Sequence, residues 1–362
     1  MRIIHAVLTV VLALASMQQG RAQTAPPANV VVITLDGLRW QEMFGGADRD
    51  YFKKGKPGEV SAAETRFWRA TPEDRRAVLM PFMWKTIATQ GQIFGDPAKG
   101  SRVHVTNGLW FSYPGYNEMF SGAPDPRVDS NDKVPNPNVT VLEWLNGRAG
   151  FKGRVAAFGA WDVLPSILNS QRSGIPVGSG FTPVPAPRTD RERAINELAT
   201  DLPAYWSYGP FDAPMVYAAL EALRTSRPRV LYVMLGEGDE WAHDGRYDLY
   251  LDATHRADRF IERVWTTLQS LPDYKGRTTL LVTTDHGRGA TTADWSDHGR
   301  KVPAAETTWM AALGPAVAPL GVRDGLTVTT SQLAATIALA VGEDFRAAAP
   351  AAAPPLPGLT RR

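Results

Sequence analysis

The sequence contains no cysteine and only six histidines among its 362 residues. The lack of cysteine excludes disulfides, thiolate catalysis and cysteine-based zinc sites, so any metal must be held by histidine and carboxylate. Neither sign of charge dominates, because 39 lysines and arginines face 37 acidic residues. This balance leaves no electrostatic footprint for nucleic acid.

The first 22 residues have the pattern of a secretory signal. Arg2 precedes an apolar stretch over residues 3–17, and small residues lead to Ala22. The stretch is too short to cross a bilayer comfortably, so we predict cleavage near Ala22 and a periplasmic or secreted protein without a transmembrane helix. An uncleaved membrane anchor is the alternative. The cleaved chain has 37 basic and 37 acidic residues, and its stability must come from its core and from bound metal.

The chain divides into one large domain with short flanking segments. Residues 23–28 form a Pro/Ala linker, residues 29–345 the domain, and residues 346–362 an Ala/Pro tail predicted to be disordered. A hydrophobic content of 44% allows a full core. Long aperiodic loops at 40–75 and 168–190 are expected to cover or rim a site and to set substrate selectivity.

Short apolar runs rich in β-branched residues alternate with helical patterns. The runs predict buried parallel strands at 29–35, 154–160, 229–235 and 278–284. The helical patterns lie at about 75–90, 138–147, 191–202, 212–226, 247–270 and 331–342. This alternation predicts an α/β fold, a doubly wound and mostly parallel sheet with helices on both faces.

Three aspartates stand where apolar runs end, namely Asp36, Asp239 and Asp285. Ligands of open parallel sheets bind outside the carboxyl ends of the strands, and all three residues fall at that edge. Three carboxylates converging there without a cation would repel one another strongly. Taken singly, each aspartate is equally explained as a turn former or a helix N-cap.

Nearby histidines favour a metal site. Asp239 and His243 have the i, i+4 spacing that puts two ligands on one helical face. Asp285 and His286 are adjacent, so they can converge only beyond the strand end, where the glycines of HGRG permit an unusual turn. A further histidine, His298, lies in DWSDHGRK.

The remaining candidates have ordinary structural explanations. His104 is expected in a strand or at an edge, and His255 on a helix surface. Asp162 ends another apolar run and could line the same rim, although capping of a helix or turn is favoured. Ser112 lies in a turn-prone Ser-Tyr-Pro-Gly stretch before a short helix, so its hydroxyl and the following N–H groups could face an anion.

Four blocks in order resemble the alkaline phosphatase superfamily of metal-dependent phosphate and sulfate ester hydrolases. They are VVVITLDGLRW, FSYPGYNEMFSG, the Asp-x-x-x-His pair followed by TTDHGRG, and DHGRK leading to MAALGP. The chain is similar in particular to the type I phosphodiesterase/nucleotide pyrophosphatase and phosphoglycerate mutase-like branches. For the latter, export away from glycolytic substrates counts against mutase activity.

The resemblance implies two divalent metal ions. One ion would be held by Asp239, His243 and His298, and the other by Asp36, Asp285 and His286 together with the Ser112 hydroxyl. Such ligands suit Zn²⁺, and Mn²⁺ stays open as an alternative. Ser112 would attack phosphorus and form a phosphoserine, which water then hydrolyses with retention at phosphorus.

Departures from the family pattern leave the ester class open. Formylglycine sulfatases need an arginine where this chain has Tyr116, which disfavours sulfate esters. Asn131 resembles the asparagine that contacts a phosphate oxygen in related phosphodiesterases, although turn formation explains it as well. Arg39, Arg300 and Lys301 could clamp a phosphate, but solvated surface charge is favoured for each.

We therefore predict a secreted hydrolase of small phosphate mono- or diesters. The alternatives are a sulfate or phosphonate ester hydrolase, and a metal-binding protein that has lost catalysis. All six ligands and a hydroxyl nucleophile are present, which argues against lost catalysis. Nothing in the sequence indicates an oligomeric state.

Overall fold

The computed structural model describes residues 28–53 and 61–361. The predicted signal at 1–22 and all but the last residue of the 23–28 linker therefore lie outside the described residues. Within the described part of the chain, no helix is long and apolar enough to cross a membrane.

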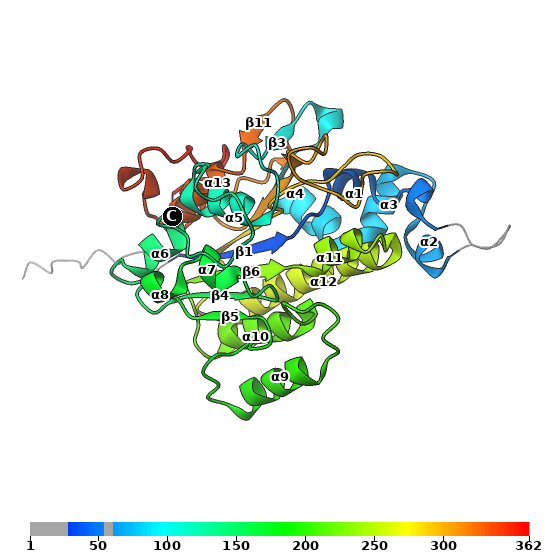
Figure 1. Ribbon diagram of the computed structural model, residues 1–362. Helices are drawn as coiled ribbons and strands as arrows, with labels where there is room; N and C mark the ends of the chain where they lie inside the picture. Colours follow the sequence, from blue (N-terminus) through cyan, green and yellow to red (C-terminus); the bar gives the residue numbers. More distant parts are fainter. Residues whose placement is uncertain (1–27, 54–60, 362) are drawn as a thin grey trace, which may run out of the picture.

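One eight-stranded sheet forms the centre of the molecule (Figure 1). In spatial order its strands are β10 (Gly321–Val322), β2 (Gln92–Phe94), β9 (Met310–Leu313), β7 (Thr278–Thr283), β1 (Asn29–Leu35), β6 (Val230–Leu235), β4 (Val155–Gly159) and β5 (Val177–Ser179). Neighbouring strands are parallel except at β9, which is antiparallel to both β2 and β7. The predicted mostly parallel sheet is confirmed, and all four predicted strands lie at its centre.

Strand β1 lies in the middle of this sheet, and this position explains why its sequence is continuously apolar. It pairs in parallel with β6 on one side, with Val32 opposite Tyr232, and with β7 on the other, with Val32 opposite Leu281. Every residue of β1 is buried, because helices cover both of its faces. The antiparallel β9 was not predicted, since its short alanine-rich run lacks β-branched residues.

Alternate residues of β1 enter two separate hydrophobic cores. Val31 and Ile33 face the first core, and Val30 and Val32 face the second. The first core is covered by α1 (Trp40–Gly45), α2 (Ala62–Phe67), α3 (Pro72–Leu79), α9 (Asp190–Asp201), α10 (Asp212–Arg224), α11 (Glu237–His243) and α12 (Tyr247–Ser270). The second is covered by α5 (Ser112–Ser121), α6 (Val141–Asn146), α7 (Leu164–Ile167) and α13 (Gln332–Ala340). Figure 1 shows α5 and α13 on one side of the sheet and α9 and α10 on the other, as predicted.

Smaller elements complete the fold. A three-stranded sheet contains β11 (Thr327–Thr329), β3 (Arg102–His104) and β8 (Thr307–Thr308), which places His104 in a strand as expected. The short helices are α4 (Ala88–Gln90), α8 (Ser170–Ser173) and the 3-10 turns η1 (Arg49–Tyr51), η3 (Pro97–Lys99) and η4 (Phe345–Ala347). Figure 1 shows the small sheet at the edge of the molecule, on the side of α5 and α13.

The helix predicted at 75–90 is not continuous. Strong helix formers lead up to Leu79, but Pro81 follows and disfavours helical geometry at Met80, where α3 gives way. The chain resumes as a π-helical turn, η2 (Met83–Ile87), and then as α4. The other predicted helices agree with α6, α9, α10, α12 and α13 within a few residues at each end.

The tail at 346–362 was predicted to be disordered, and for its described residues this prediction is wrong. Leu356 is only 3% exposed, and its N–H donates to the Thr336 hydroxyl of α13 at 2.9 Å. Gln92 of β2 donates to the Gly358 carbonyl at 2.8 Å. Leu356 and Ala352 give the segment an apolar anchor, and its prolines reduce the chain entropy that ordering costs.

We expect Asp258 to be a main support of the broken helix. Its carboxylate accepts the N–H groups of Phe82 and Met83 at 2.8 and 2.9 Å, where the π-helical turn begins. Asp258→Ala should lower the free energy of unfolding by about 2–4 kcal/mol, because two buried N–H groups lose their acceptor. Urea unfolding measures this, with exposed Glu262→Ala on the same helix as the control within about 0.5 kcal/mol. Equal midpoints for the two variants would contradict the assignment.

Candidate metal centre

Strands β1, β6 and β7 bring three buried carboxylates to one edge of the sheet. Asp36 directly follows β1, Asp285 lies two residues beyond β7, and Asp239 lies in the first turn of α11 after β6. Their side chains are buried, and the exposed fractions of the three residues are 5%, 0% and 8% in that order. The predicted convergence at the carboxyl edge is confirmed.

A first cluster surrounds the Nε2 atom of His286. Asp36 Oδ1 lies 3.3 Å from this nitrogen, Asp285 Oδ2 lies 3.4 Å from it, and Ser112 Oγ lies 3.3 Å from it. The structure thus brings together the four residues that the resemblance implies as ligands of one ion. All four are buried.

The donor atoms of this first cluster fit a cation. Nδ1 of His286 contacts the Gly287 carbonyl at 2.9 Å, so Nδ1 carries the proton and Nε2 offers a lone pair. Asp36 Oδ1 and Asp285 Oδ2 are buried and have no hydrogen-bond donor among the described residues. Lone pairs that face one another without a proton between them are unfavourable, and a divalent ion would resolve this.

A second cluster is centred on Asp239. His243 Nε2 lies 3.1 Å from Asp239 Oδ2 and 3.0 Å from His298 Nε2, which itself lies 3.8 Å from Asp239 Oδ1. The i, i+4 spacing on α11 accounts for the first contact. Burial, reinforced by the nearby His286, lowers the pKa of His298 to about 2, so its ring is neutral and able to bind a metal.

The two clusters are in contact through the His286 ring. His286 Nε2 is 3.7 Å from Asp239 Oδ1, and the rings of His286 and His298 stack with their centroids 4.0 Å apart. Asp36, Asp285 and His286 form one group of possible ligands, and Asp239, His286 and His298 form another. Two ions could therefore lie close together here.

The charges of the carboxylates are strongly perturbed. Burial, together with the charge of Asp239, raises the pKa of Asp36 well above its usual range. Burial and the charge of Asp36 do the same to the pKa of Asp285. Burial opposes ionisation of Asp239 too, but Arg288 and His243 outweigh it and hold its pKa well below the usual range.

Arg288 is the residue of this centre that the sequence did not reveal. Its guanidinium forms an ion pair with Asp239 Oδ1 and donates to the Asp239 carbonyl at 3.1 Å, and the residue is 1% exposed. Arg288 lies two positions after His286, and an arginine on the surface could have the same sequence context. Only the tertiary structure shows that its partner is Asp239.

Glycines allow the close approach of backbones around the centre. A Cβ atom at Gly115 would lie 2.6 Å from the Asp285 carbonyl, and one at Gly287 would lie 2.3 Å from the Thr307 carbonyl. Neither Gly287 nor Gly289 has a positive φ, so the predicted unusual turn is wrong. The glycines are required by space, because only a hydrogen fits between the segments.

Ser112 begins α5, and a buried carboxylate holds the turn before it. Glu118 accepts the N–H groups of Thr106 and Asn107 at 2.9–3.0 Å. The Asn107 side chain in turn accepts the N–H of Trp110 at 3.0 Å, which supports that residue in a left-handed conformation with φ of 56°. This network fixes the direction in which Ser112 leaves the loop.

A pocket of about 290 Å³ lies over both clusters. Asp36, Ser112, Asp239, His243 and His298 line it together with Asn131, Trp161, Tyr208, Gly236 and Glu240. Asn131 accepts the Tyr113 N–H at 3.0 Å through its carbonyl oxygen, so its amide NH₂ is directed elsewhere. Trp161, Tyr208 and Glu240 were not predicted, because nothing in their sequence context separates them from packing residues.

Several predictions for the remaining charged and polar residues need correction. Arg39 is not on the surface but fully buried, paired with Glu42 and donating to the Gly289 carbonyl at 2.9 Å. Asp162 does not cap a helix or line the pocket, and pairs with Lys133 at 2.6 Å. The pairing explains both results, because a buried guanidinium needs a carboxylate and an exposed carboxylate attracts lysine.

The other polar candidates lie away from the pocket. Arg300 and Lys301 are exposed, as expected, and do not line it. His255 lies in α12 but is half-buried rather than on the surface, since its Nδ1 contacts the Leu79 carbonyl at 2.9 Å. Neither His255 nor His104 belongs to the metal clusters.

Comparison with solved structures identifies the fold. A protein in the alkaline phosphatase superfamily from Vibrio parahaemolyticus is 12% identical, with a TM-score of 0.54 over 88% of this chain and 67% of that one. The lipoteichoic acid synthase LtaP from Listeria monocytogenes is 10% identical, with a TM-score of 0.56 over 88% and 73%. Murine ectonucleotide pyrophosphatase/phosphodiesterase 5 is 12% identical, with a TM-score of 0.52 over 91% and 97%.

No protein-family model and no curated protein matches the sequence. The chain therefore has the alkaline phosphatase-like fold that its sequence blocks led us to expect. Sequence identities this low support a common fold and nothing more. The neighbours in this fold include hydrolases, among them a phosphonate monoester hydrolase from Silicibacter pomeroyi at 14% identity and a TM-score of 0.51 over 90% of this chain and 77% of that one.

We expect Asp285→Asn to have opposite effects with and without metal. The pKa of Asp285 is higher in the folded state than in the unfolded state, so ionisation of this carboxyl group destabilises the fold. The destabilisation is absent at low pH and grows as the pH rises above the unfolded-state pKa. Metal-free Asp285→Asn should therefore melt at a higher temperature than metal-free wild type at pH 8, and at nearly the same temperature at pH 4. The amide oxygen can still accept the Gly37 N–H, which Asp285 now accepts at 3.1 Å.

With zinc at about one hundred times its Kd, wild type should gain about 2.7 kcal/mol, and Asp285→Asn should gain much less. Calorimetry of both proteins before and after chelation makes the comparison. Exposed Asp244→Asn at the end of α11 is the matched control and should behave as wild type. A metal-free variant less stable than metal-free wild type at pH 8 would refute the proposed repulsion.

Proposed function

We propose that this chain is a two-metal hydrolase of small phosphate esters, with Ser112 as its nucleophile. One observation carries the proposal: the Ser112 hydroxyl lies 3.3 Å from His286 Nε2, within a cluster of possible Asp and His metal ligands beneath a 290 Å³ pocket. Two buried carboxylate oxygens of that cluster accept no hydrogen bond from the described residues, which supports a cation there. The fold shared with hydrolases agrees with this chemistry.

The proposed ligand sets are those given by the sequence. Asp36, Asp285, His286 and Ser112 would hold one ion, and Asp239, His243 and His298 the other. Bound there, the ions would lower the pKa of the Ser112 hydroxyl and stabilise negative charge on the departing oxygen. Neutral histidines and carboxylates suit Zn²⁺, and Mn²⁺ is the second choice.

Ser112 is positioned for attack by its place at the start of α5. Its Oγ faces the pocket, and the first N–H groups of the helix favour negative charge in front of them. In the reaction, Oγ loses its proton to solvent and bonds to phosphorus, while the bond from phosphorus to the ester oxygen breaks and that oxygen takes up a proton and leaves as the alcohol. Water then attacks phosphorus of the phosphoserine, which releases phosphate and restores the Ser112 hydroxyl.

Asn131 is proposed to bind a phosphate oxygen. Its carbonyl oxygen is engaged by the Tyr113 N–H, which leaves the amide NH₂ as a donor in the pocket lining. The donor would strengthen its hydrogen bond as negative charge builds up on the phosphate oxygens.

Tyr116 supports the choice of phosphate over sulfate esters. It stands where the formylglycine motif requires arginine, and its hydroxyl donates to Asp36 Oδ2 at 2.8 Å. Because it is fully buried and bonded to a proposed ligand, it has a supporting function rather than one in modification. Export by way of residues 1–22 remains part of the proposal, as does action on small esters in the periplasm or outside the cell.

Ser112→Ala should lower kcat for nitrophenyl phosphate esters by about 10³-fold or more, because the covalent route is lost. Zinc content should stay near wild type, since Asp36, Asp285 and His286, the other three proposed ligands of that ion, remain. Ser121→Ala at the other end of α5 is the matched control, and its activity should be unchanged. Retained activity in Ser112→Ala would show that the nucleophile is misassigned.

The assay should cover an aryl phosphate monoester, a diester, a phosphonate and a sulfate in parallel. Rapid acid quench of wild type should also trap phosphate on Ser112, detectable by mass spectrometry. Turnover of the sulfate alone, with no phosphoserine, would replace the proposal by the sulfatase alternative.

Asn131→Ala should lower kcat by about 10–100-fold with little change in zinc affinity, because one donor to the transition state is removed. Asn131→Asp keeps the oxygen that accepts the Tyr113 N–H but places an acid beside the phosphate. It should therefore be at least as impaired as Asn131→Ala. Recovery of activity in Asn131→Asp would reduce Asn131 to a cap of α5.

A further inference from the structure

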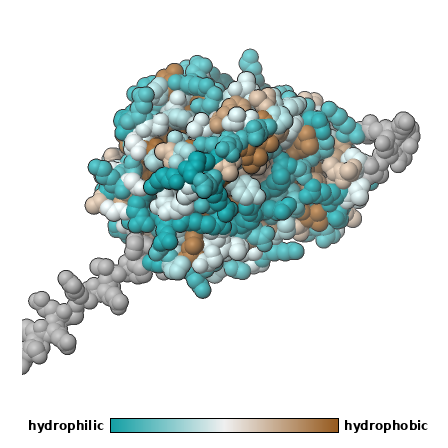
Figure 2. Space-filling model, turned by 90° about the horizontal axis from the view of Figure 1, so that it is seen from below, coloured by the Kyte–Doolittle hydropathy of each residue, from teal (hydrophilic) through white to brown (hydrophobic). Residues whose placement is uncertain are grey.

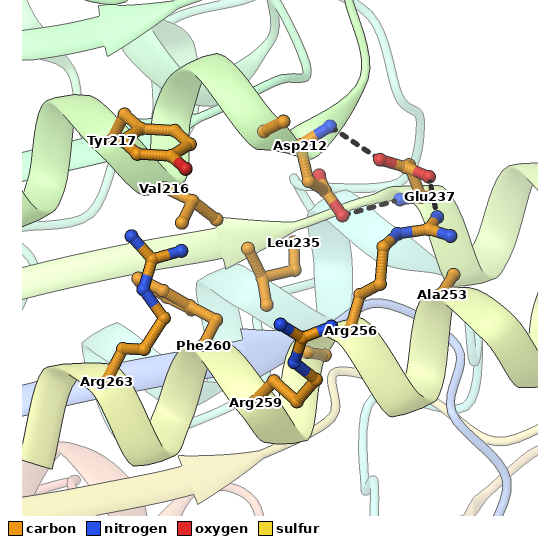
Figure 3. A pocket seen from close by; sticks show the side chains of 12 residues that line it. Asp212, Val216, Tyr217, Leu235, Glu237, Ala253, Arg256, Arg259, Phe260 and Arg263 are labelled. Carbon is orange, nitrogen blue, oxygen red and sulfur yellow. Dashed lines mark hydrogen bonds and ion pairs between the residues drawn. The ribbon is translucent and has the colours of Figure 1, made fainter.

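A second pocket lies between α10 and α12, away from the proposed metal ligands, with a volume of about 170 Å³ (Figure 3). It is lined by Val216 and Tyr217 of α10, Leu235 at the end of β6, and Phe260 and three arginines of α12. Apolar side chains and guanidinium groups therefore line the same pocket.

The arginines follow from the periodicity of α12. Arg256, Arg259 and Arg263 are spaced at i, i+3 and i+7, so all three side chains leave the helix on the face next to α10. Figure 3 shows the guanidinium of Arg263 rising from α12 toward Val216 and Tyr217. Arginine side chains on one helical face normally repel one another unless acids separate them.

Only one of these guanidiniums is neutralised. Arg256 pairs with Glu237 and with Asp252. Arg263 has only a cation–π contact with the Tyr217 ring, at 4.9 Å, and Arg259 has no ion pair within the described ranges. Two uncompensated positive charges therefore border the apolar part of the pocket.

The two acidic residues of the pocket, Asp212 and Glu237, have hydrogen-bond partners within the protein. Asp212 accepts the Gly236 N–H at 2.8 Å. It also accepts the Glu237 N–H at 3.2 Å, and Glu237 accepts the Asp212 N–H at 2.9 Å (Figure 3). Glu237 is also the partner of Arg256. Neither acid is left to neutralise Arg259 or Arg263.

Size and surroundings restrict the occupant. A cavity of about 150 Å³ can hold one benzene ring, so this pocket has room for a ring-sized apolar body with a small head group. The face that carries α9 and α10 is mainly hydrophilic, with hydrophobic residues in small separate patches (Figure 2). A small molecule fits such a local hollow better than a protein surface would.

We propose that the pocket between α10 and α12 binds a small organic anion, with its apolar body against Val216, Leu235 and Phe260 and its anionic head on Arg259 and Arg263. The guanidinium fork matches a carboxylate or a phosphate-like head equally. This site goes beyond the proposed hydrolase activity and does not depend on it.

Isothermal calorimetry with benzoate tests the site, using the full chain with metal and again after chelation. Benzoate should bind one per chain in both forms, because the pocket contains none of the proposed metal ligands. Phenylphosphonate in the chelated protein tests the phosphate-like head. Benzyl alcohol and benzylamine should bind at least about tenfold more weakly than benzoate, since they lack the anion.

Arg259→Gln and Arg263→Gln should each weaken benzoate binding about tenfold. Arg102→Gln removes an equal charge from the small sheet and should leave the Kd unchanged. Val216→Phe keeps every arginine but fills the apolar part of the pocket, so this substitution should abolish benzoate binding. Benzoate binding that survives both arginine substitutions, or no binding at all in wild type, would overturn the proposal while leaving the hydrolase untouched.

Discussion

The repulsion among Asp36, Asp239 and Asp285 is the constraint on which the rest of the structure depends. Three buried carboxylates meet at one sheet edge, and within the described chain only Arg288 forms an ion pair with any of them through a permanent positive charge. Burial and the neighbouring carboxylates raise the pKa of Asp36 and of Asp285 and so favour their protonated forms. The two divalent ions proposed above would turn this deficit into an excess of positive charge suited to a phosphate.

The supports of the centre come from segments far apart in sequence. Tyr116 of α5 bonds to Asp36, and Gly115 lets the same helix touch the Asp285 backbone. Ser112, the proposed nucleophile, is therefore held by the helix that also contacts the proposed ligands Asp36 and Asp285. A shift of α5 would move Ser112 and disturb Asp36 together, so the position of the hydroxyl and the integrity of the cluster are coupled.

The sequence could predict the central sheet because β1, β4, β6 and β7 are buried on both faces and read as continuous apolar runs. Strand ends indicated Asp36, Asp239 and Asp285, and the i, i+4 spacing added His243. The division into two ligand sets, and the places of His298 and Ser112 in them, came from the resemblance of the sequence blocks alone. The sequence could not predict Arg288, Glu118 or Arg39, since their partners are set by loops whose paths depend on tertiary contacts. The ordered tail was not predicted for a similar reason, because its composition is typical of disorder and its order depends on tertiary contacts, such as the burial of Leu356 and its hydrogen bond to Thr336 of α13.

Arg288 gives the two proposed metal sites different characters. It binds Asp239 on the side that faces His286, so Asp239 stays ionised without any metal, whereas Asp36 and Asp285 have no such partner. The site with His243 and His298 is then formed in advance, with a charged carboxylate and two histidines. The site beside Ser112 needs its ion to ionise its own ligands. Because the pKa values of Asp36 and Asp285 are raised, metal binding at the site beside Ser112 should release protons from these carboxyl groups. At the other site, burial lowers the pKa of His243 but Asp239 outweighs it and raises that pKa, so His243 is the group that should release a proton there.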